Sequence, residues 1–438
     1  MIEALKAFIR PAPEMPRIQD PTRIKSDYRY WRTRIMYSMM SGYAVYYFVR
    51  KNFSIANKSI SEEFHFSNTE MGLILSAATV AYGISKFASG ILVDILNPRF
   101  LMSAGLILSA LTNIFFGMGA GLTVFIVLWA LNNLFQGLGM PPCGKLLNSW
   151  FSRKEGGRAW GLWNASHQIG GGLIFLIAGF LVSEYGWRSS FYVPGVFAIL
   201  VGLFLINRLR DTPAALGLPP VHEYAGESDP FKEAQTQSGR EIFINYILKN
   251  RILWIVCIAN IFVYIVRIGV FDWAPKFLVS ERGFTTKEAS VAGFAFEVSG
   301  IFGAIAAGWL SDTAFPGRRG AIATVFMVWL AAAIGIVFAS PSGNFWLMIF
   351  AMVSVGFFVY GPQVLVAVVA AENVDARAVG TAVGMTGFFG YVGATICGVG
   401  TGYVVDHFGW DVALVVYLIS ALIGAGLFAI AWKPVMRR

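Results

Sequence analysis

Two arginines, Arg50 and Arg267, lie about 15 residues inside long apolar runs. If each run is helical, a rise of about 1.5 Å per residue places both side chains near the centre of a membrane. A charged group at that depth is costly and is usually retained for a function. The guanidinium group stays charged and offers a planar fork that matches phosphate. The two arginines therefore predict an anion-binding site inside the membrane.

Further charged residues lie deep in the apolar runs, namely Lys51, Lys86, Asp272 and Glu297. With the two arginines, they leave an excess of about two positive charges, which matches a phosphate monoester carrying between one and two negative charges. The alternative is a structural role, in which the cations pair internally or extend to the membrane surface. That alternative fits Lys276, near the end of a run, better than it fits Arg50 or Arg267.

Polar and aromatic residues accompany these charges. His167 lies in the segment WNASHQIGGG, beside Asn164 and Gln168. Because imidazole titrates near neutral pH, His167 is a candidate for substrate contact or pH sensing, the alternative being an ordinary hydrogen-bonded polar residue. Tyrosines offer both a hydroxyl group and an apolar wall, although aromatic stripes also serve in packing. The candidates for lining a substrate cavity are Tyr43, Tyr47, Tyr82, Tyr264, Tyr360 and Tyr391, together with Asn164, Gln168 and Met140.

The composition of the chain excludes a soluble fold. Of its 438 residues, 56% are hydrophobic and 13% are charged, whereas soluble domains carry about 25% charged residues. A run of roughly 20 apolar residues can cross a bilayer. Such runs lie near 34–56, 69–94, 99–118, 121–150, 158–183, 188–208, 252–280, 287–311, 320–340, 344–371, 378–404 and 410–432. We therefore predict an all-α integral membrane protein with twelve transmembrane helices.

A charged, proline-containing stretch separates the first six runs from the last six. The predicted order is a cytoplasmic N-terminal segment (1–33), an N-terminal six-helix half (34–208), a cytoplasmic linker (209–250), a C-terminal six-helix half (251–432) and a cytoplasmic tail (433–438). Cations gather in loops on one side, which the positive-inside rule assigns to the cytoplasm, so both termini are expected there. The net charge of +9 therefore reflects topology rather than nucleic-acid binding.

Four landmarks recur in the two sets of runs, 217 to 223 residues apart. They are Arg50 and Arg267, GILVD ending at Asp94 and GWLSD ending at Asp312, GRAWG and ARAVG, and EYGW and HFGW. Two parallel, pseudo-symmetric six-helix halves follow, with a binding site expected at their interface near the midplane. Asp94 and Asp312 are expected to have a gating or capping role, pairing with basic residues such as Arg99 and Arg318.

No set of catalytic residues stands out in the sequence. There is no P-loop for ATP. The three cysteines, Cys143, Cys257 and Cys397, fall in apolar runs at spacings that suit neither a metal site nor a disulfide framework. We therefore expect a transporter rather than an enzyme, with no cofactor and no metal.

Several segments resemble those of the organophosphate:inorganic phosphate antiporters of the major facilitator superfamily, from about residue 27 to residue 432. The segments are GYAVYYFVRKNF, YGISKFASGILVD, FQGLGMPPCGK, WNASHQIGGG, YIVRIGVFDW, FVYGPQVL and GTAVGMTGFFGYVG. YRYWR before the first run and RLRDTPAALGLP after the sixth are most similar to the hexose-phosphate sensor-transporter subgroup. The resemblance implies a major facilitator fold and a carrier of organophosphates.

The same resemblance assigns roles to the buried charges. It implies that Arg50 and Arg267 bind phosphate, with Lys86 and His167 nearby. It also implies charge pairs that rearrange during transport, formed by Lys51, Asp272 and Glu297. Two departures bear on the substrate. Met140 stands where the glycerol-3-phosphate carriers have tryptophan, and AVGMTGF in the eleventh run lacks the Asp and Lys of the classical hexose-phosphate carrier.

These observations predict exchange of a sugar phosphate, best glucose-6-phosphate, for inorganic phosphate by alternating access. The expected protein is a monomer that spans a bacterial inner membrane several times. One alternative is a membrane sensor for glucose-6-phosphate that signals to a sensor-kinase partner with little transport. Others are a glycerol-3-phosphate:phosphate antiporter and a proton-coupled symporter for a carboxylate, with Glu297 or His167 as its proton site.

Overall fold

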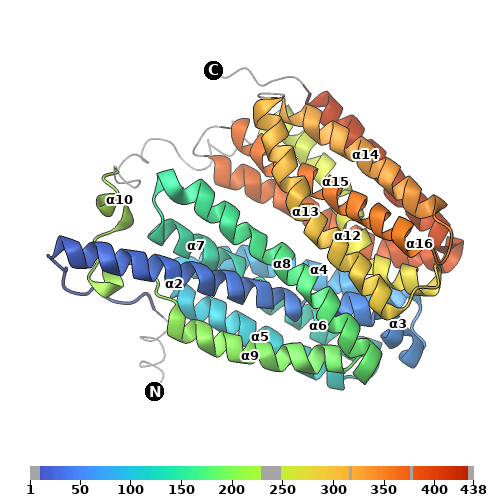
Figure 1. Ribbon diagram of the computed structural model, residues 1–438, viewed down its shortest axis with the longest axis horizontal. Helices are drawn as coiled ribbons and strands as arrows, with labels where there is room; N and C mark the ends of the chain where they lie inside the picture. The colour runs from blue at the N-terminus through green and yellow to red at the C-terminus, as the bar shows by residue number, and fades with distance from the viewer. Residues whose placement is uncertain (1–9, 228–247, 315–317, 375–377, 433–438) are drawn as a thin grey trace.

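The computed structural model is built of long helices joined by short connections (Figure 1). It describes residues 10–227, 248–314, 318–374 and 378–432. The predicted tail and parts of the predicted N-terminal segment and linker lie outside the described residues. The N-terminal half contains α2 (Pro21–Phe48), α3 (Asn52–Phe64), α4 (Asn68–Ile95), α5 (Pro98–Met118), α6 (Leu122–Gln136), α7 (Met140–Trp150), α8 (Arg153–Tyr185) and α9 (Ser189–Arg208). The C-terminal half contains α12 (Arg251–Ser280), α13 (Thr286–Thr313), α14 (Arg319–Ala339), α15 (Phe345–Glu372) and α16 (Val379–Ile430).

The prediction of twelve crossings is confirmed, although four of the crossings are not made by a separate single helix. In the described part of the chain, ten helices are long and apolar enough to cross a membrane, with α6 and α7 counted as one. The 52-residue α16 contains two crossings, because Gly409, at a φ of 81°, breaks it where the last span was predicted to begin. The first crossing is made by α2 and α3, which are separated by a short break at residues 49–51.

The repeat between the halves extends to the caps of their helices. At the start of α4, the Ser67 hydroxyl accepts a hydrogen bond from the Glu70 backbone N–H, and the Glu70 carboxylate accepts one from the Ser67 backbone. Thr285 and Glu288 form the same arrangement at the start of α13. Such a capping box satisfies backbone donors that the first helical turn leaves free. The two halves therefore begin their second crossing in the same way.

Contacts between the halves gather at one end of the molecule, where α8 and α13 converge in Figure 1. Polar contacts cross the interface there through Lys51–Asp272, Ser61–Lys276, Asn68 and Thr69–Asp406, Ser76–Thr395 and Glu184–Lys287. We call this set of contacts the seam. In the N-terminal half, the residues of the seam come from α3, the start of α4 and the end of α8.

Glycines let the two backbones touch along the seam. A Cβ added at Gly72 on α4 would lie 2.4 Å from the carbonyl oxygen of Gly398, and one added at Gly179 on α8 would lie 2.1 Å from the Ser290 hydroxyl. Further along the same paired helices, toward the opposite end, a Cβ at Gly83 or Gly387 would meet nothing within 4 Å. The halves are therefore closed at the seam and diverge toward the other end.

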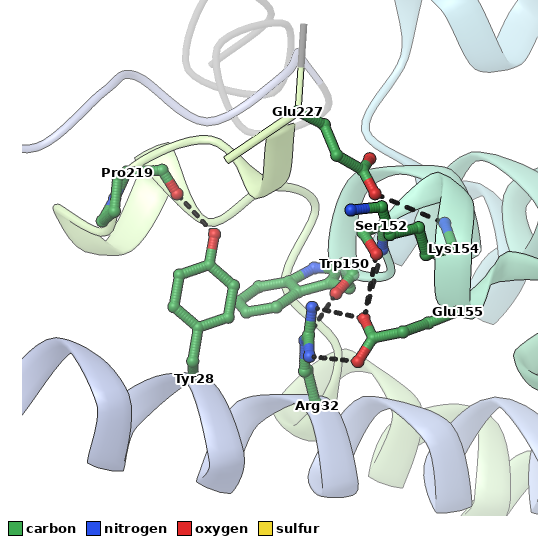
Figure 2. A network of polar contacts seen from close by, with 8 residues as sticks. All are labelled: Tyr28, Arg32, Trp150, Ser152, Lys154, Glu155, Pro219 and Glu227. Carbon is green, nitrogen blue, oxygen red and sulfur yellow. Dashed lines mark hydrogen bonds and ion pairs between the residues drawn. The ribbon is translucent and has the colours of Figure 1, made fainter. Parts of the chain in front are cut away.

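That other end carries a polar cluster that ties the start of α2 to the segment after α9 (Figure 2). The Tyr28 hydroxyl donates to the Pro219 carbonyl at 2.5 Å, and its ring stacks on Tyr224 at 3.9 Å. Burial raises the pKa of the Tyr28 hydroxyl, so it remains a donor at neutral pH. One turn later, Arg32 donates to the Trp150 carbonyl at 2.8 Å and pairs with Glu155 at 3.0 Å.

Backbone pairing continues this attachment. The Ile18 N–H donates to the Gly217 carbonyl at 2.8 Å, and the Ala12 N–H donates to the Asp211 carboxylate at 2.7 Å. We call the contacts of residues 12–32 with residues 150–155 and 211–227 the clasp. The clasp holds the first part of the predicted linker against the N-terminal half. The polar composition of this segment did not indicate that it would be ordered. We call this end of the molecule the basic end, because Arg32, Arg210 and Arg319 lie there.

Candidate functional site

Arg50 lies in the break between α2 and α3. The backbone N–H groups of Arg50 and Lys51 both donate to the Tyr47 carbonyl, which ends the first helix before α3 begins at Asn52. The guanidinium carbon of Arg50 lies 3.9 Å from the centre of the Tyr82 ring on α4 and 5.8 Å from that of Tyr47. Both distances are within cation–π range. Aromatic faces therefore hold this arginine.

A chain of tyrosine rings connects Arg50 to the other half. Tyr82 lies 5.1 Å from Tyr391 on α16, and Tyr391 lies 5.8 Å from Tyr264 on α12. The guanidinium carbon of Arg267 lies 5.7 Å from the Tyr264 ring. The Lys86 ammonium group lies 5.3 Å from the Tyr391 ring. The structure thus brings predicted site residues from four helices and both halves into one cluster.

Arg267 is linked through a tyrosine to Glu297, the one carboxylate of this cluster among the described residues. Nη2 of Arg267 donates to the Tyr360 hydroxyl at 3.4 Å, and that hydroxyl donates to Oε1 of Glu297 at 2.5 Å. Within the described chain, Nε of Arg267 and Oε2 of Glu297 are buried without a hydrogen-bond partner. A buried guanidinium N–H without an acceptor is unfavourable. It is therefore available to a bound anion.

Lys51 and Asp272 form a separate pair. Nζ of Lys51 lies 2.8 Å from Oδ1 of Asp272 and 4.0 Å from the centre of the Phe271 ring, and both charged side chains are buried. The Ser54 hydroxyl also donates to Asp272, at 3.0 Å. Since this pair is neutral, the cluster retains Arg50, Lys86 and Arg267 against Glu297. The predicted excess of two positive charges is preserved in the fold.

The remaining predicted residues lie around this cluster at different depths. His167 lies 5.9 Å from the Tyr47 ring, and Tyr43 contacts Tyr47 and packs on Trp163 at 4.7 Å. Gln168 is buried and Asn164 is exposed. Met140 is the first residue of α7 and packs, half-buried, against the hydrophobic core.

The expectation that a loop aspartate pairs with a nearby basic residue holds for Asp312, although the arginine is not the one named. Asp312 pairs with Arg319, at 3.1 Å, rather than with Arg318, because Arg319 is the first residue of α14 and points back to α13 and α15. Arg99 was proposed as the partner of Asp94, but its Nε donates to the Ile206 carbonyl at the end of α9. Next to Asp94, the Lys145 ammonium group donates to the backbone carbonyl of Val93.

Sequence reasoning missed three contributors. Phe271 covers Lys51, and Trp163 forms the wall behind Tyr43. Asp406 accepts hydrogen bonds from the backbone and side chains of Asn68 and Thr69, at 2.6 to 3.0 Å, although it lies more than 330 residues away along the chain. The position of Asp406, one turn before Gly409, is the only sequence signal that could have placed it at a helix end.

A family model of the Major Facilitator Superfamily matches residues 39–397. A probable hexose phosphate transport protein of Chlamydia pneumoniae is 41% identical, over 97% of this chain and 96% of its own. The membrane sensor protein UhpC of Escherichia coli is 38% identical, over 95% of this chain and 96% of its own. A glycerol-3-phosphate transporter of Bacillus subtilis is 36% identical, over 97% of this chain and 98% of its own.

Proposed function

Because the chain belongs to the major facilitator superfamily, among its organophosphate transporters, we propose that it exchanges a sugar phosphate for inorganic phosphate by alternating access. Glucose-6-phosphate is the best candidate for the organic substrate, since three relatives named as probable hexose phosphate transport proteins are 38% to 41% identical to this chain. With the basic end in the cytoplasm, the closed seam faces outward and the arrangement described above is the inward-facing state.

One observation carries the proposal. Each half contributes one arginine, Arg50 or Arg267, to a single tyrosine-lined cluster in which cations outnumber carboxylates. A phosphate group can accept hydrogen bonds from both guanidinium groups at once and neutralise the excess charge. The rest of a sugar phosphate would then lie against tyrosine faces and hydroxyl groups.

The mechanism follows from this charge balance. Without an anion, drawing the two halves together around the cluster concentrates like charges in a medium of low dielectric, which is unfavourable. A bound phosphate removes that repulsion and joins the two halves, so closure at the basic end becomes favourable only when the site is loaded. Each reorientation then carries an anion, and transport takes the form of an exchange.

The test uses proteoliposomes loaded with phosphate. We expect uptake of labelled phosphate, competed by glucose-6-phosphate more strongly than by glycerol-3-phosphate or phosphoglycerate. Arg267→Ala removes charge-assisted hydrogen bonds worth about 1.5–3 kcal/mol each, so exchange should fall by roughly 100-fold or more. Arg251→Ala is the matched control, because Arg251 is exposed at the start of the same helix. Near-normal exchange by Arg267→Ala would refute the proposal.

A second candidate is a sensor, because a membrane sensor protein is among the full-length relatives. In that role, the same cluster binds the sugar phosphate, and the bound state is read by a membrane kinase partner. The liposome assay separates the two roles. Saturable binding of glucose-6-phosphate without phosphate exchange would favour the sensor, and exchange would favour the carrier.

A further inference from the structure

A cavity of about 670 Å³ lies at the basic end, between the start of α2 and the end of α9, away from the central cluster. Four cationic side chains line it, and no carboxylate does among the described residues: Lys25, Arg29, Arg34 and Arg208. Asp27, on the same stretch of α2, is not part of the lining and lies 3.6 Å from Arg23. The cavity is therefore a concentrated positive surface.

Among the described residues, Arg34 is the one of these four cations whose side chain makes hydrogen bonds. Arg34 donates to the Tyr30 hydroxyl at 2.6 Å and to the Asn207 carbonyl at 3.1 Å. In the described ranges, the side chains of Lys25, Arg29 and Arg208 form no hydrogen bond or ion pair, although the Arg208 guanidinium carbon lies 5.3 Å from the Phe204 ring. Three positive groups are thus available to an anion.

The surroundings of the cavity fit a membrane–water boundary. Tyr30 and Tyr37 line it and are 53% and 43% exposed. Tyrosines are enriched at the level of lipid headgroups. Toward the middle of α9, on the face that carries Arg208, Leu200 is 60% exposed and Phe197 is 47% exposed. Cations therefore lie at the outer rim, and an apolar surface continues inward from them.

We infer that this cavity binds the headgroup of an anionic phospholipid from the leaflet at the basic end. The lipid phosphodiester would lie among Lys25, Arg29 and Arg208, and its acyl chains would follow the apolar face of α9. Basic pockets between transmembrane helices on the cytoplasmic side bind anionic headgroups in this way. Burial and the neighbouring Arg34 lower the pKa of Arg210, the second residue after Arg208, which agrees with a local excess of positive charge.

The test is native mass spectrometry of the full-length chain titrated with phosphatidylglycerol or phosphatidylcholine. We expect tighter binding of phosphatidylglycerol, weakened about 30-fold by Lys25→Gln with Arg29→Gln, since each cation near the surface contributes about fivefold. The matched control, Arg10→Gln with Arg23→Gln, removes two exposed cations from the same segment but outside the cavity. It should leave the affinity unchanged.

Three results would overturn the inference. They are equal affinity for the two lipids, equal weakening in both double variants, and displacement of phosphatidylglycerol by millimolar inorganic phosphate. The last result would mean that the cavity is a site for soluble phosphate. Since Lys25 and Arg29 are exposed, the variants should fold, and unchanged circular dichroism and elution volume would establish that they do.

Discussion

Both arginines of the central cluster are held by aromatic faces, with no carboxylate in direct contact with either among the described residues. A ring face stabilises a cation without occupying the N–H groups at its edge. Arg50 over Tyr82 and Arg267 over Tyr360, at 3.9 and 4.8 Å, therefore keep donors for a ligand. A direct carboxylate partner would compete with the phosphate for those same donors. This arrangement would suit the proposed function, in which the site releases its anion in every cycle.

Tyr360 separates Arg267 from Glu297, which leads to a prediction about affinity. Tyr360→Phe removes the hydroxyl that accepts from Arg267 and donates to Glu297. Glu297 can then pair with Arg267 directly and compete with the substrate. Loss of a buried hydrogen bond costs about 1–3 kcal/mol, so we expect the KM for phosphate exchange to rise by roughly 10-fold, with a smaller change in kcat.

The control for this variant is Tyr192→Phe, which removes a hydroxyl that donates to the Gly117 carbonyl away from the cluster. Its KM should remain that of the parent protein. An unchanged KM in Tyr360→Phe would mean that Glu297 does not compete with the anion.

The sequence predicted the members of this cluster better than their partners. Arg50, Arg267 and the tyrosines could be found because charge inside an apolar run has few interpretations. The tyrosine between Arg267 and Glu297 could not be assigned, because Tyr360 lies on a third helix and its contact depends on how α15 packs against α12 and α13. Likewise, Asp312 has two adjacent candidates, and only the orientation of the first turn of α14 selects Arg319.

At the scale of helices, α4 with α16 and α8 with α13 make the interface between the halves. Gly72 and Gly398 make backbone contact across the seam, whereas Gly83 and Gly387, further along the same two helices, face open space. Because these helices are long, tilting them could exchange separation at one end for contact at the other. The glycines that now face open space would then become the positions of contact.

Gly72 offers a direct test of this packing. In Gly72→Leu, the new side chain would meet the backbone of Gly398 and Val399 at 2.4 to 2.8 Å, where nothing can move cheaply. We expect the seam to loosen, so that hydrogen–deuterium exchange becomes faster in α3 and around residues 395–402. Gly83→Leu on the same helix has open space and should leave that exchange unchanged. Equal protection in the two variants would contradict a seam closed by backbone contact.

The clasp allows a prediction about stability. Arg32→Ala removes the hydrogen bond to the Trp150 carbonyl, the pair with Glu155 and the cation–π contact with Tyr28. We expect a loss of about 1–3 kcal/mol, seen as a Tm lower by several degrees in a thermal-shift assay. Arg23→Ala removes an exposed pair on the same helix and should change the Tm little. Equal melting of the two variants would show that the clasp is not stabilising.

The clasp also marks where helix-scale prediction failed. Residues 211–227 contain few apolar groups, so composition indicated a plain linker. Their order comes from long-range pairing with residues 12–18 and from burial of Leu218. Neither the long-range pairing nor the burial of Leu218 can be recognised from a short stretch of sequence. By contrast, the crossings were predictable because each needs about 20 apolar residues, whatever its neighbours are.

At the scale of the whole molecule, the hydrogen bonds and ion pairs that the structure describes between the halves lie at the seam, whereas the deeper cluster adds ring contacts such as Tyr82–Tyr391. Asp406 is a main part of the seam, since four hydrogen bonds from Asn68 and Thr69 end on its carboxylate. The cluster of arginines and tyrosines lies deeper in the molecule than the seam. The seam and a bound ligand would therefore both affect the movement of the two halves, but from different positions. The seam favours one arrangement of the halves whether or not the site is loaded.

Asp406→Ala should therefore shift the balance between arrangements while leaving the binding cluster intact. Exposed charge-assisted hydrogen bonds are individually weak, and about 1.4 kcal/mol in total would change the ratio by tenfold. Spin labels at positions 62 and 281, both exposed near the seam, should report a larger population of long distances. Asp411→Ala, an exposed aspartate on the same helix, should not change the distribution. Identical distributions in all three proteins would rule out this role for Asp406.

The placement of the seam has a consequence for how fast the protein could work. Contacts that touch no substrate set the dwell time of one state, so substitutions among them can shorten or lengthen a cycle without altering which anion is chosen. In the proposed cycle, selectivity would depend on the tyrosine-lined cluster, and the rate would depend on a few seam residues such as Asp406, Lys276 and Glu184. Two relatives with the same cluster could therefore recognise the same molecule and differ in whether they pass it across the membrane or merely hold it.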